Sequence, residues 1–327
     1  MSVVERTCAG WQIVALRSAC AEAEVLPGKG GDILSFRRLA DGLDLLWTSP
    51  WGLRARGALS AASDSEGRLM EAYPGGWQTV FPNGGDAAVA QNTTWGMHGE
   101  AWLAPFRWQR VADSAIEMTA DLVHSPFRVI KQVTLEGVTV AVTETITNHG
   151  GHPVEVMWGH HPAFGAPLID EGTIVDCAAG TVIADDLAPE GLTDVRPGAS
   201  GRWPGIGGFP GGTADLRHMP GPGSRLSRML YLSDFTRGLV RISNQRLGLG
   251  ARLEWDAVAL PHAWYWLEAH GTAGFPWFQR AYVLGIEPAS SVPAHGITAA
   301  RATMTFAPGQ SRTVRVSVTI TDGSPGG

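Results

Sequence analysis

The sequence predicts an all-β protein. Three observations support this: β-branched residues fill several short runs, Gly and Pro punctuate the whole chain, and no long segment shows the 3.6-residue period of a capped helix. Of the 327 residues, 42 are Gly and 21 are Pro, and their spread indicates many turns between short strands. A hydrophobic fraction of 44% with only 17% charged residues allows a sizeable core.

The clearest hairpin lies near the middle of the chain. Residues 129–147 contain two runs rich in Val, Ile and Thr, separated by Glu136-Gly137. A two-residue turn of this kind typically joins antiparallel strands. Residues 153–158 predict a further strand, which leads into His160 and His161.

The C-terminal region repeats the strand pattern. Residues 303–306 and 313–320 are expected to be strands, with a turn at Pro308-Gly309. Helix signals are weak, and the Ala-rich stretch at residues 58–62 is expected to form at most a short helical turn.

One long segment interrupts this regular pattern. Residues 185–225 are rich in Gly, Pro and Asp and predict a long irregular excursion. A loop of this length in a compact domain is typically a lid, a binding loop or a disordered segment. We find no linker or internal repeat, and we therefore expect residues 1–327 to form a single domain of packed sheets.

Charge and cysteine content narrow the classes of function. The net charge is −6 and the chain has no dense Lys/Arg run, which argues against a nucleic-acid partner. The first residues lack the pattern of a signal peptide, and no apolar run approaches the length of a membrane span. Cys8, Cys20 and Cys177 lack metal-binding spacing, so we expect reduced thiols in a cytoplasmic protein.

Two distant segments offer the groups that proton transfer needs. Pro162 biases the preceding His161 toward an extended backbone. Glu287 follows the apolar run of residues 282–286, where a carboxylate is costly unless it is hydrogen-bonded or functional. An imidazole and a carboxylate that converge on one pocket can transfer protons at neutral pH. We therefore expect general acid–base chemistry at a site built from these segments.

The same residues raise the alternative of a metal site. His98, His160 and His161 with Glu287 would make a three-histidine, one-carboxylate ligand set. The chain contains no HxH or HExxH spacing, and we expect neither a metal nor another cofactor.

Aromatic residues are candidates for the walls of the pocket. The chain has 13 Trp, and several stand beside the segments named above: Trp77, Trp95, Trp102, Trp158, Trp264 and Trp266. A single Trp is more often a core residue than a ligand contact. We nevertheless expect Trp264 and Trp266 to stack on the apolar face of a sugar ring.

Polar residues are candidates for contacts with substrate hydroxyl groups. Gln78 and Asn83 lie in the Gly-rich segment of residues 73–85 and offer amide donors, although Asn-Gly is also a common turn pair. His98 precedes Gly and has Trp on both sides in the sequence, which makes it a candidate for a binding role on an equal footing with a purely structural one. His160 is a further substrate-binding candidate.

Taken in order, these motifs resemble the aldose 1-epimerase (galactose mutarotase) superfamily, and in particular its less characterised branch of "aldose 1-epimerase family proteins". That family has a Thr-Asn-x-Gly turn, a strand and then His-Pro-Tyr-Phe, and this chain has Thr147-Asn148-His149-Gly150, a strand at 154–158 and His161-Pro162-Ala163-Phe164. His98-Gly99, Ile286-Glu287-Pro288 and the turn at Pro308-Gly309-Gln310 resemble three further family elements. The likeness runs from about residue 27 to residue 320.

The resemblance implies a large β-supersandwich of antiparallel sheets with few short helices. It also implies a small carbohydrate substrate and a reaction that interconverts the α and β anomers of a free sugar without a cofactor. On this basis His161 is the general acid, Glu287 is the general base and His98 binds the sugar. His161 is then expected to start protonated and Glu287 ionised, because their opposite charges attract each other.

The sequence departs from the family at three pocket positions. The Tyr of the family motif is Ala163 here. The early pocket Arg has no clear match, and Gln78 or Asn83 is expected to replace it. Asp234 is the candidate for the substrate-binding Asp.

Other functions remain open at this point. One is a sugar-binding or sensing protein without turnover, since a fold does not establish an activity. Another is an isomerase or epimerase of a modified or acidic sugar, which Arg54, Arg56 or Arg128 in the pocket would support. A metal-dependent isomerase is a third. Low surface charge and many aromatic residues are compatible with a homodimer.

Overall fold

The computed structural model describes residues 1–187 and 192–324. Within these residues a larger sheet contains β1 (Ser2–Cys8), β2 (Trp11–Arg17), β3 (Ala21–Leu26), β4 (Asp32–Arg38), β5 (Trp77–Val80), β13 (Gly159–Phe164), β15 (Thr181–Ala184), β16 (Ser200–Gly201), β19 (Leu226–Ser233), β22 (His262–Ala269) and β23 (Tyr282–Ala289). A smaller sheet contains β8 (Arg107–Ala112), β9 (Ala115–Asp121), β10 (Phe127–Glu136), β11 (Thr139–Asn148), β14 (Ile174–Cys177), β20 (Gly238–Asn244), β21 (Leu249–Trp255) and β25 (Ser311–Thr321).

Three two-stranded ribbons accompany these sheets. They are β6 (Ala88–Ala90) with β7 (Thr93–Trp95), β12 (Val154–Val156) with β24 (Met304–Phe306), and β17 (Gly205–Gly207) with β18 (Thr213–Asp215). The described helices are α1 (Ser65–Glu71) and the single 3₁₀ turn η1 (Gln245–Leu247).

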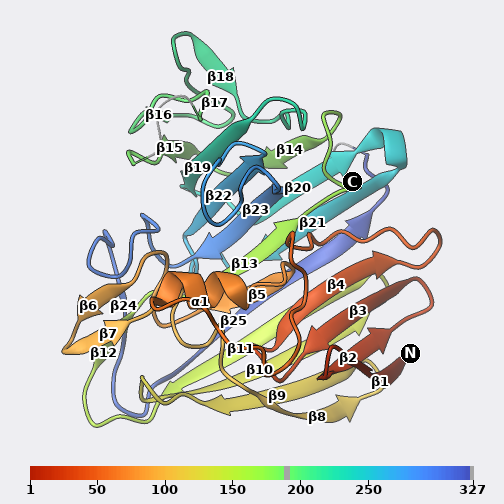
Figure 1. Ribbon diagram of the computed structural model, residues 1–327, viewed down its shortest axis with the longest axis vertical. Coiled ribbons are helices and arrows are strands. Elements are labelled where there is room, and N and C mark those ends of the chain that lie inside the picture. The colour runs from red at the N-terminus through yellow and green to blue at the C-terminus, as the bar shows by residue number, and fades with distance from the viewer. Residues whose placement is uncertain (188–191, 325–327) are drawn as a thin grey trace.

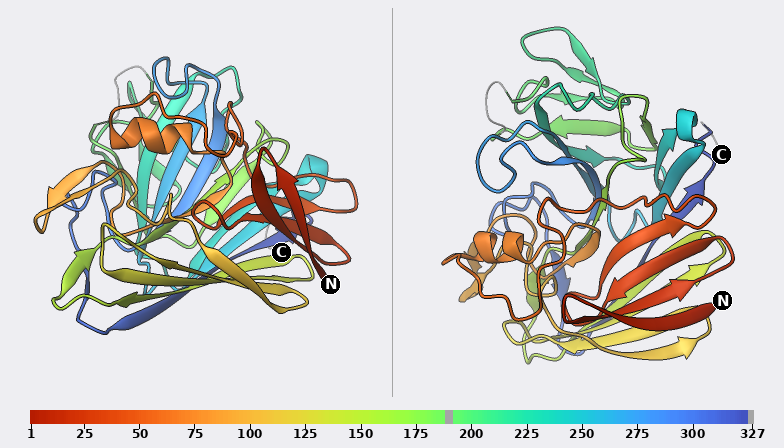
Figure 2. Two further views of the ribbon diagram at one scale, coloured as in Figure 1. Left: turned by 60° about the horizontal axis from the view of Figure 1, so that its bottom comes forward. Right: turned by 45° about the vertical axis from the view of Figure 1, so that its right-hand side comes forward.

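The two large sheets form the layers of a sandwich (Figure 1). The larger runs in the order β1-β2-β3-β4-β5-β13-β23-β22-β19-β15-β16, and the smaller in the order β14-β20-β21-β25-β11-β10-β9-β8. Figure 2 shows α1 on the side of the larger sheet that faces away from the smaller one. This architecture confirms the predicted all-β sandwich with few short helices.

The strands predicted in the middle and at the end of the chain are present. β10 and β11 pair along their whole length around the predicted turn, and β24 and β25 match the two C-terminal runs. β24 nevertheless pairs with β12 rather than with β25. The strand predicted at 153–158 is shorter in the structure: β12 ends at Val156, the amide groups of Met157 and Trp158 bond to Pro82 O and Ser290 Oγ, and β13 begins at Gly159. His160 and His161 therefore lie inside a strand.

The helical turn predicted at residues 58–62 is wrong. The helix begins at Ser65, after Asp64, whose side chain accepts a hydrogen bond from the Gly67 amide at 2.7 Å. Glu66 adds a negative charge in the first turn, where it interacts favourably with the helix dipole. A capping side chain therefore outweighs the high helix propensity of the nearby alanines.

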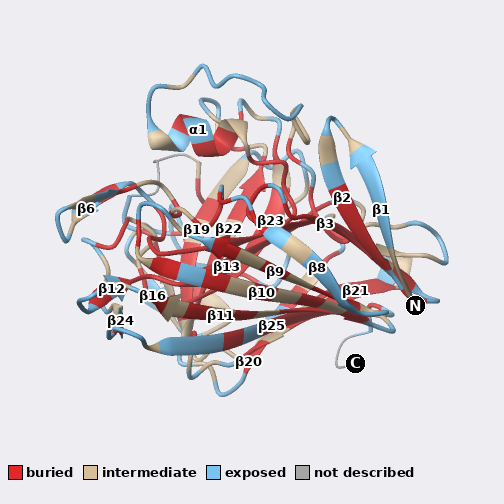
Figure 3. Cartoon of the chain, turned by 90° about the horizontal axis from the view of Figure 1, so that it is seen from below, coloured by how far each residue is buried: buried red, intermediate tan, exposed pale blue. Residues whose placement is uncertain are grey.

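The core lies between the sheets. Along β10, buried residues alternate with partly or fully exposed ones, as Figure 3 shows from below. Phe81, Phe127 and Phe306 meet in the core with ring centroids 4.8–6.2 Å apart. This alternation is expected of a sheet with one face on the core and the other toward solvent.

A buried polar cluster joins the two sheets. Glu144 on β11 is fully buried and lies 3.2 Å from Lys131 Nζ and 3.4 Å from His160 Nε2. It also accepts hydrogen bonds from Trp158 Nε1, at 3.1 Å, and from Thr79. Burial of a carboxylate is tolerated here because several donors converge on it.

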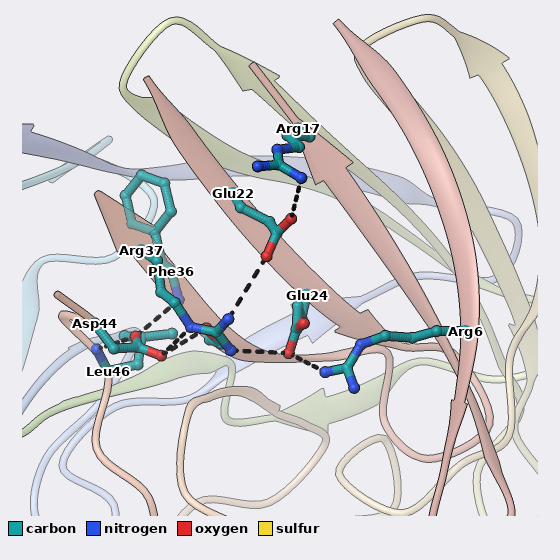
Figure 4. A network of polar contacts seen from close by, with 9 residues as sticks. Arg6, Arg17, Glu22, Glu24, Phe36, Arg37, Asp44 and Leu46 are labelled. Carbon is teal, nitrogen blue, oxygen red and sulfur yellow. Dashed lines mark hydrogen bonds and ion pairs between the residues drawn. The ribbon is translucent and has the colours of Figure 1, made fainter. Parts of the chain in front are cut away.

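The outer strands of the larger sheet carry a second, more exposed ion network (Figure 4). Glu24 accepts from Arg6 at 2.5 Å and from Arg37 at 3.3 Å. Arg37 also reaches Glu22, which lies 3.8 Å from Arg17. Charged side chains of this kind discourage pairing of an edge hairpin with another chain.

The segment of residues 185–225, predicted to be irregular, runs from the end of β15 to the start of β19 and carries only β16, β17 and β18 among its described residues. Residues 188–191 of that prediction lie outside the described residues. Buried Arg228 anchors the segment through Asp194, with contacts of 2.7 and 2.5 Å. A lid function for this segment stays a prediction.

Two further observations concern the chain as a whole. Cys8, Cys20 and Cys177 carry free thiols. None of the described helices combines the length and the apolar character that a bilayer crossing would need.

Candidate functional site

One row of side chains runs across the larger sheet on the face turned away from the smaller sheet. Strand register pairs Gln78 with His161, Glu287 with Trp264, and Trp264 with Tyr231. The register of β13 with β23 places His161 opposite Glu287. Directly opposed residues share a face of a sheet, so five strands contribute neighbouring side chains to this row.

The centre of the row is a histidine–carboxylate pair. His161 Nε2 lies 3.3 Å from Glu287 Oε1. The two residues are only 6% and 3% exposed, respectively. The sequence prediction named this pair, and the structure brings the two side chains together.

The next row on the same face contains small residues beside the pair. Register aligns Ala163 with Gly285, Gly285 with Trp266, and Trp266 with Met229. A Cβ atom on Gly285 would lie 2.7 Å from Glu287 Oε1 and 3.1 Å from a ring carbon of Trp266. Glycine at this position therefore leaves the space that the carboxylate occupies.

A cavity of about 240 Å³ opens above these rows. It is lined by His98, His161 and Glu287, by the aromatic residues Tyr73, Trp102, Tyr231, Trp264, Trp266 and Trp277, and by Glu66, Met70, Gly85, Met97, Met229, Pro276, Ala294 and His295. The cavity therefore combines an apolar aromatic wall with a few polar groups, which is typical of small-molecule sites.

Aromatic rings surround His161. Its ring centroid lies 5.1 Å from that of Trp102, and 5.6 Å from those of Tyr73 and Trp266. Trp277 extends this wall and is 5.4 Å from Trp266. Both predicted platform residues, Trp264 and Trp266, line the cavity. Of the other tryptophans considered from the sequence, Trp102 lines it, whereas Trp77, Trp95 and Trp158 do not.

His98 is held rigidly at the cavity wall. Its backbone has a positive φ of 54°, and its ring stacks on Trp102 at 4.9 Å with an interplanar angle of 12°. Nδ1 accepts a hydrogen bond from the Gly85 amide at 3.2 Å. Burial lowers the pKa of His98 to about 4. The ring is therefore neutral at pH 7 and carries its proton on Nε2, as a hydrogen-bond donor.

Burial also shifts the pKa values of His161 and Glu287. It lowers the pKa of His161 well below its ordinary value and raises the pKa of Glu287 well above it. Both shifts favour uncharged forms because the cavity floor is shielded from water. These shifts oppose the ion pair of protonated His161 and ionised Glu287 that the sequence led us to expect. Burial instead favours an uncharged pair in which the two side chains share one proton.

Tyr73 supplies a polar group that sequence reasoning did not single out. It is 1% exposed, and its hydroxyl has no hydrogen-bond partner within the described residues. Burial, with smaller contributions from Glu287 and Asp32, raises the pKa of Tyr73 well above 10. The phenol is therefore neutral. His161 Nδ1 is likewise buried without a partner within the described residues. Two polar atoms at this site can therefore form hydrogen bonds with a ligand.

The structure does not bring Gln78 and Asn83 to the cavity. Gln78 shares the face of His161, but its amide donates to Asp32 at 3.2 Å and to Gly75 O at 2.6 Å. The side chain of Asn83 donates to the backbone oxygens of Asp86 and Gly96, and accepts from the Ile297 amide. These amides hold loops in place and are absent from the cavity lining.

His160 and Asp234 also lie away from the cavity. His160 points to the opposite face of β13, where it accepts a hydrogen bond from Trp77 Nε1 at 3.2 Å. Asp234 lies in an exposed turn and accepts from Thr181 Oγ1 at 2.5 Å. The substrate contacts expected from their positions in the sequence are therefore not supported by the geometry.

The arginines considered for an acidic substrate have other partners. Arg54 pairs with Glu71 at 3.1 Å, Arg128 pairs with Asp121 at 2.7 Å, and Arg56 lies over the ring of Trp11. The described residues that line the cavity include neither Lys nor Arg.

His295 lies at the cavity rim, between two carboxylates. His295 Nδ1 lies 3.0 Å from Asp86 and Nε2 lies 2.8 Å from Asp185. Within the described residues, Asp185, Asp186 and His295 form the one group whose possible metal-ligand atoms lie within 4.8 Å of one another. The alternative set of His98, His160, His161 and Glu287 is not such a group.

Several lining residues were not singled out by sequence reasoning. Glu66 and Met70 come from α1, and Pro276, Trp277 and His295 come from loops around β23. Of the residues that were missed, Tyr73 could have been found, because it stands in the Gly-rich segment of residues 73–85. Loop residues lack a periodic pattern that would place them.

Residues 8–197, more than half of the chain, match the family described as "Domain of unknown function (DUF4432)". No curated protein matches the chain.

Solved structures show the fold. A "putative aldose 1-epimerase" from Klebsiella pneumoniae is similar with a TM-score of 0.73 and 18% identity, over 96% of this chain and 80% of that one. A galactose mutarotase-like protein from Clostridium acetobutylicum has a TM-score of 0.66 and 13% identity, over 98% of both chains. Another from Lactobacillus casei has a TM-score of 0.63 and 17% identity, over 94% and 99%. The predicted galactose mutarotase-like fold is confirmed.

Proposed function

Because the chain belongs to the family described as "Domain of unknown function (DUF4432)", whose description leaves the activity open, we propose a function from the site itself. The proposed activity is that of an aldose 1-epimerase, which interconverts the α and β anomers of a free sugar. The observation that carries it is the 3.3 Å contact between His161 Nε2 and Glu287 Oε1 on the floor of an aromatic cavity.

The reaction needs one proton removed and one proton delivered. A base takes the proton from the hydroxyl on C1, an acid protonates the ring oxygen, and the bond between C1 and the ring oxygen breaks. The resulting aldehyde rotates about the C1–C2 bond, and closure on its other face reverses both transfers. Because both oxygens are attached to C1, an acid and a base side by side can reach them together.

The central pair holds the single proton that this cycle requires. With the proton on His161, the imidazolium is the acid and Glu287 is the base, as the family resemblance implies. With the proton on Glu287, the uncharged form favoured by burial, the carboxylic acid and the neutral imidazole exchange these roles. In either form the pair carries one proton before ring opening and one proton after it.

The surrounding residues suit a monosaccharide. Trp264 and Trp266 offer flat surfaces to the apolar face of a ring. The hydroxyl of Tyr73 and Nε2 of His98 can bond to sugar hydroxyl groups. A cavity of about 240 Å³ suits a small ligand rather than a polymer.

The test is anomer exchange measured by proton NMR. A panel of free aldoses is offered to the wild-type protein, to Glu287→Gln and to Glu136→Gln, a matched change at an exposed site on the β10–β11 hairpin. We expect fast exchange in the wild type and in Glu136→Gln. Loss of the general acid–base group should lower the rate by about 10²- to 10⁴-fold in Glu287→Gln.

Two outcomes would contradict the proposal. If the folded wild-type protein accelerates exchange of no aldose in the panel, the mutarotase function is wrong and a sugar-binding protein becomes the better description. If Glu287→Gln retains the wild-type rate, the pair is not the catalytic centre.

A further inference from the structure

We propose that the preferred substrate is an amino sugar, a free aldose with a protonated amino group on a ring carbon remote from C1. This inference rests on the proposed function and adds the substrate class. It is carried by the charges around the cavity mouth and by the aromatic wall below them.

The lining of the cavity lacks a counter-charge for an anionic sugar. Its described residues include neither Lys nor Arg. A phosphate or carboxylate would therefore enter an aromatic pocket without a cationic partner, which is unfavourable. The buried Lys29 lies 5.4 Å from the ring centroid of Trp102, and Asp32 already neutralises it at 2.5 Å.

The mouth of the cavity carries a carboxylate instead. Glu66 lines the cavity from α1 and forms no ion pair within residues 1–187 and 192–324. His295, which also lines the cavity, lies between Asp86 and Asp185, which do not line it. Glu66 and Glu287 are therefore the carboxylates in the described lining, and any positive charge on His295 is already matched by its own two partners.

The pKa shifts agree with this excess of negative charge. Burial and then the nearby Asp64 and Asp86 raise the pKa of Glu66, as expected for carboxylates that repel one another. The exposed Arg301 lines a neighbouring cavity with Asp185 and Asp186 and not this one. A bound ammonium group would relieve the repulsion.

The aromatic wall provides the second and independent argument. Trp102, Trp264, Trp266, Trp277 and Tyr73 surround the space. Cations are attracted to the faces of aromatic rings, and aromatic cages recognise ammonium ligands in this way.

Burial gives the direction in which the sugar lies. His161 and Glu287 form the floor, whereas Glu66 is exposed and His295 is 22% exposed on its side chain. C1 and the ring oxygen must lie at the floor for the reaction to occur. An amino group that meets a carboxylate at the mouth therefore lies on the far side of the ring, as on C3, and not on C2 or C6, which adjoin C1 and the carbon next to the ring oxygen.

The experiment compares sugars of one ring configuration that differ only in charge. Anomer exchange is measured for glucose, 3-amino-3-deoxyglucose, 6-amino-6-deoxyglucose, 2-amino-2-deoxyglucose and glucuronic acid, and again for the galacto series. We expect kcat/KM for the 3-amino sugar to exceed that of the neutral sugar by about threefold or more, and the 2- and 6-amino sugars to show a smaller preference. Glucuronic acid should be the poorest substrate, and added salt should reduce the preference.

Variants at the mouth separate charge from shape. Glu66→Gln should lower the ratio of amino to neutral sugar by about threefold, and Glu66→Lys should shift the preference toward glucuronic acid. Glu136→Gln, an exposed change on the β10–β11 hairpin, should leave the ratio unchanged. Equal ratios in the wild type and in Glu66→Lys would overturn the inference.

Binding to Glu287→Gln distinguishes the two proposals. Affinities for the same sugars are measured by titration calorimetry, without any need for turnover. If no sugar is exchanged by the wild type but amino sugars still bind most tightly, the proposed function fails and the charge preference stands. If neutral sugars are exchanged, and bound, as well as or better than their amino forms, the function stands and the inference is wrong.

Discussion

Two adjacent histidines on β13 show how strand geometry assigns chemistry to residues. His161 faces the cavity and lies 3.3 Å from Glu287. His160 faces the other layer and lies 3.4 Å from Glu144. Both are buried imidazoles with pKa values lowered by burial, so their local chemistry is alike. What separates their roles is the alternation of side chains along a strand.

The central pair predicts the pH dependence of the proposed activity. The pair is active with one proton and fails when it gains a second at low pH or loses the last at high pH. Because burial lowers the pKa of His161, the low-pH loss should occur below pH 6.5. Because burial raises the pKa of Glu287, the high-pH loss should lie well above pH 4.5.

The measurement is kcat/KM for anomer exchange between pH 4 and 10, corrected for the uncatalysed reaction at each pH. No acid-side fall in activity is expected at or above pH 6.5. A fall in activity centred at or above pH 6.5 on the acid side would show that His161 titrates as an ordinary exposed imidazole, and would contradict this account of burial.

At the scale of elements, local pairing was predictable and distant pairing was not. The β10–β11 hairpin follows from two β-branched runs and one turn. The site instead depends on β13 pairing with both β5 and β23, segments separated by about two hundred residues. His161 and Glu287 could be named from motif and residue type. The absence of Gln78 from the cavity could not be predicted, because its hydrogen-bond partner Asp32 lies on β4.

Gly285 on β23 offers a test of this element. Gly285→Ala places a methyl group 2.7 Å from Glu287 Oε1, so the carboxylate must move. We expect kcat for anomer exchange to fall by about tenfold or more, as small displacements of catalytic groups have large effects. Circular dichroism and thermal unfolding should remain close to those of the wild type.

The control for that variant is Gly137→Ala, in the β10–β11 turn. Gly137 has a positive φ of 58° and open space around it. This change is expected to cost some stability through backbone strain and to leave kcat unchanged. If Gly285→Ala also left kcat unchanged, the position of the carboxylate would not depend on the glycine.

At the scale of the whole molecule, the catalytic face depends on a buried contact behind it. Glu144 reaches from the smaller sheet to His160, Thr79 and Trp158, all on or beside β5 and β13. No pattern in the sequence marked Glu144, because the strand that carries it reads as an ordinary β-branched run. These three partners lie on or beside strands of the larger sheet, and the sequence does not show which strands of the two sheets face each other.

Removal of that charge should destabilise the protein. Glu144→Gln leaves Lys131 without its carboxylate partner in a buried site, which typically costs about 3 kcal/mol or more. Arg17→Gln, in the network of Figure 4, loses an exposed contact of 3.8 Å and should cost less than about 0.5 kcal/mol. Chemical denaturation of the two variants measures both values, and equal losses would contradict this ranking.

Two adjacent histidines on opposite faces of β13 affect how this chain tolerates insertions and deletions. A one-residue slip of β13 against its neighbours exchanges the faces. In one direction the slip brings His160 to the position of His161, so that an imidazole still stands beside Glu287, and in the other direction it brings Pro162 there. A deletion scan should therefore find β13 more tolerant of the first slip than β23 is of either, because a slip of β23 replaces Glu287 with Ile286 or Pro288 and no carboxylate remains.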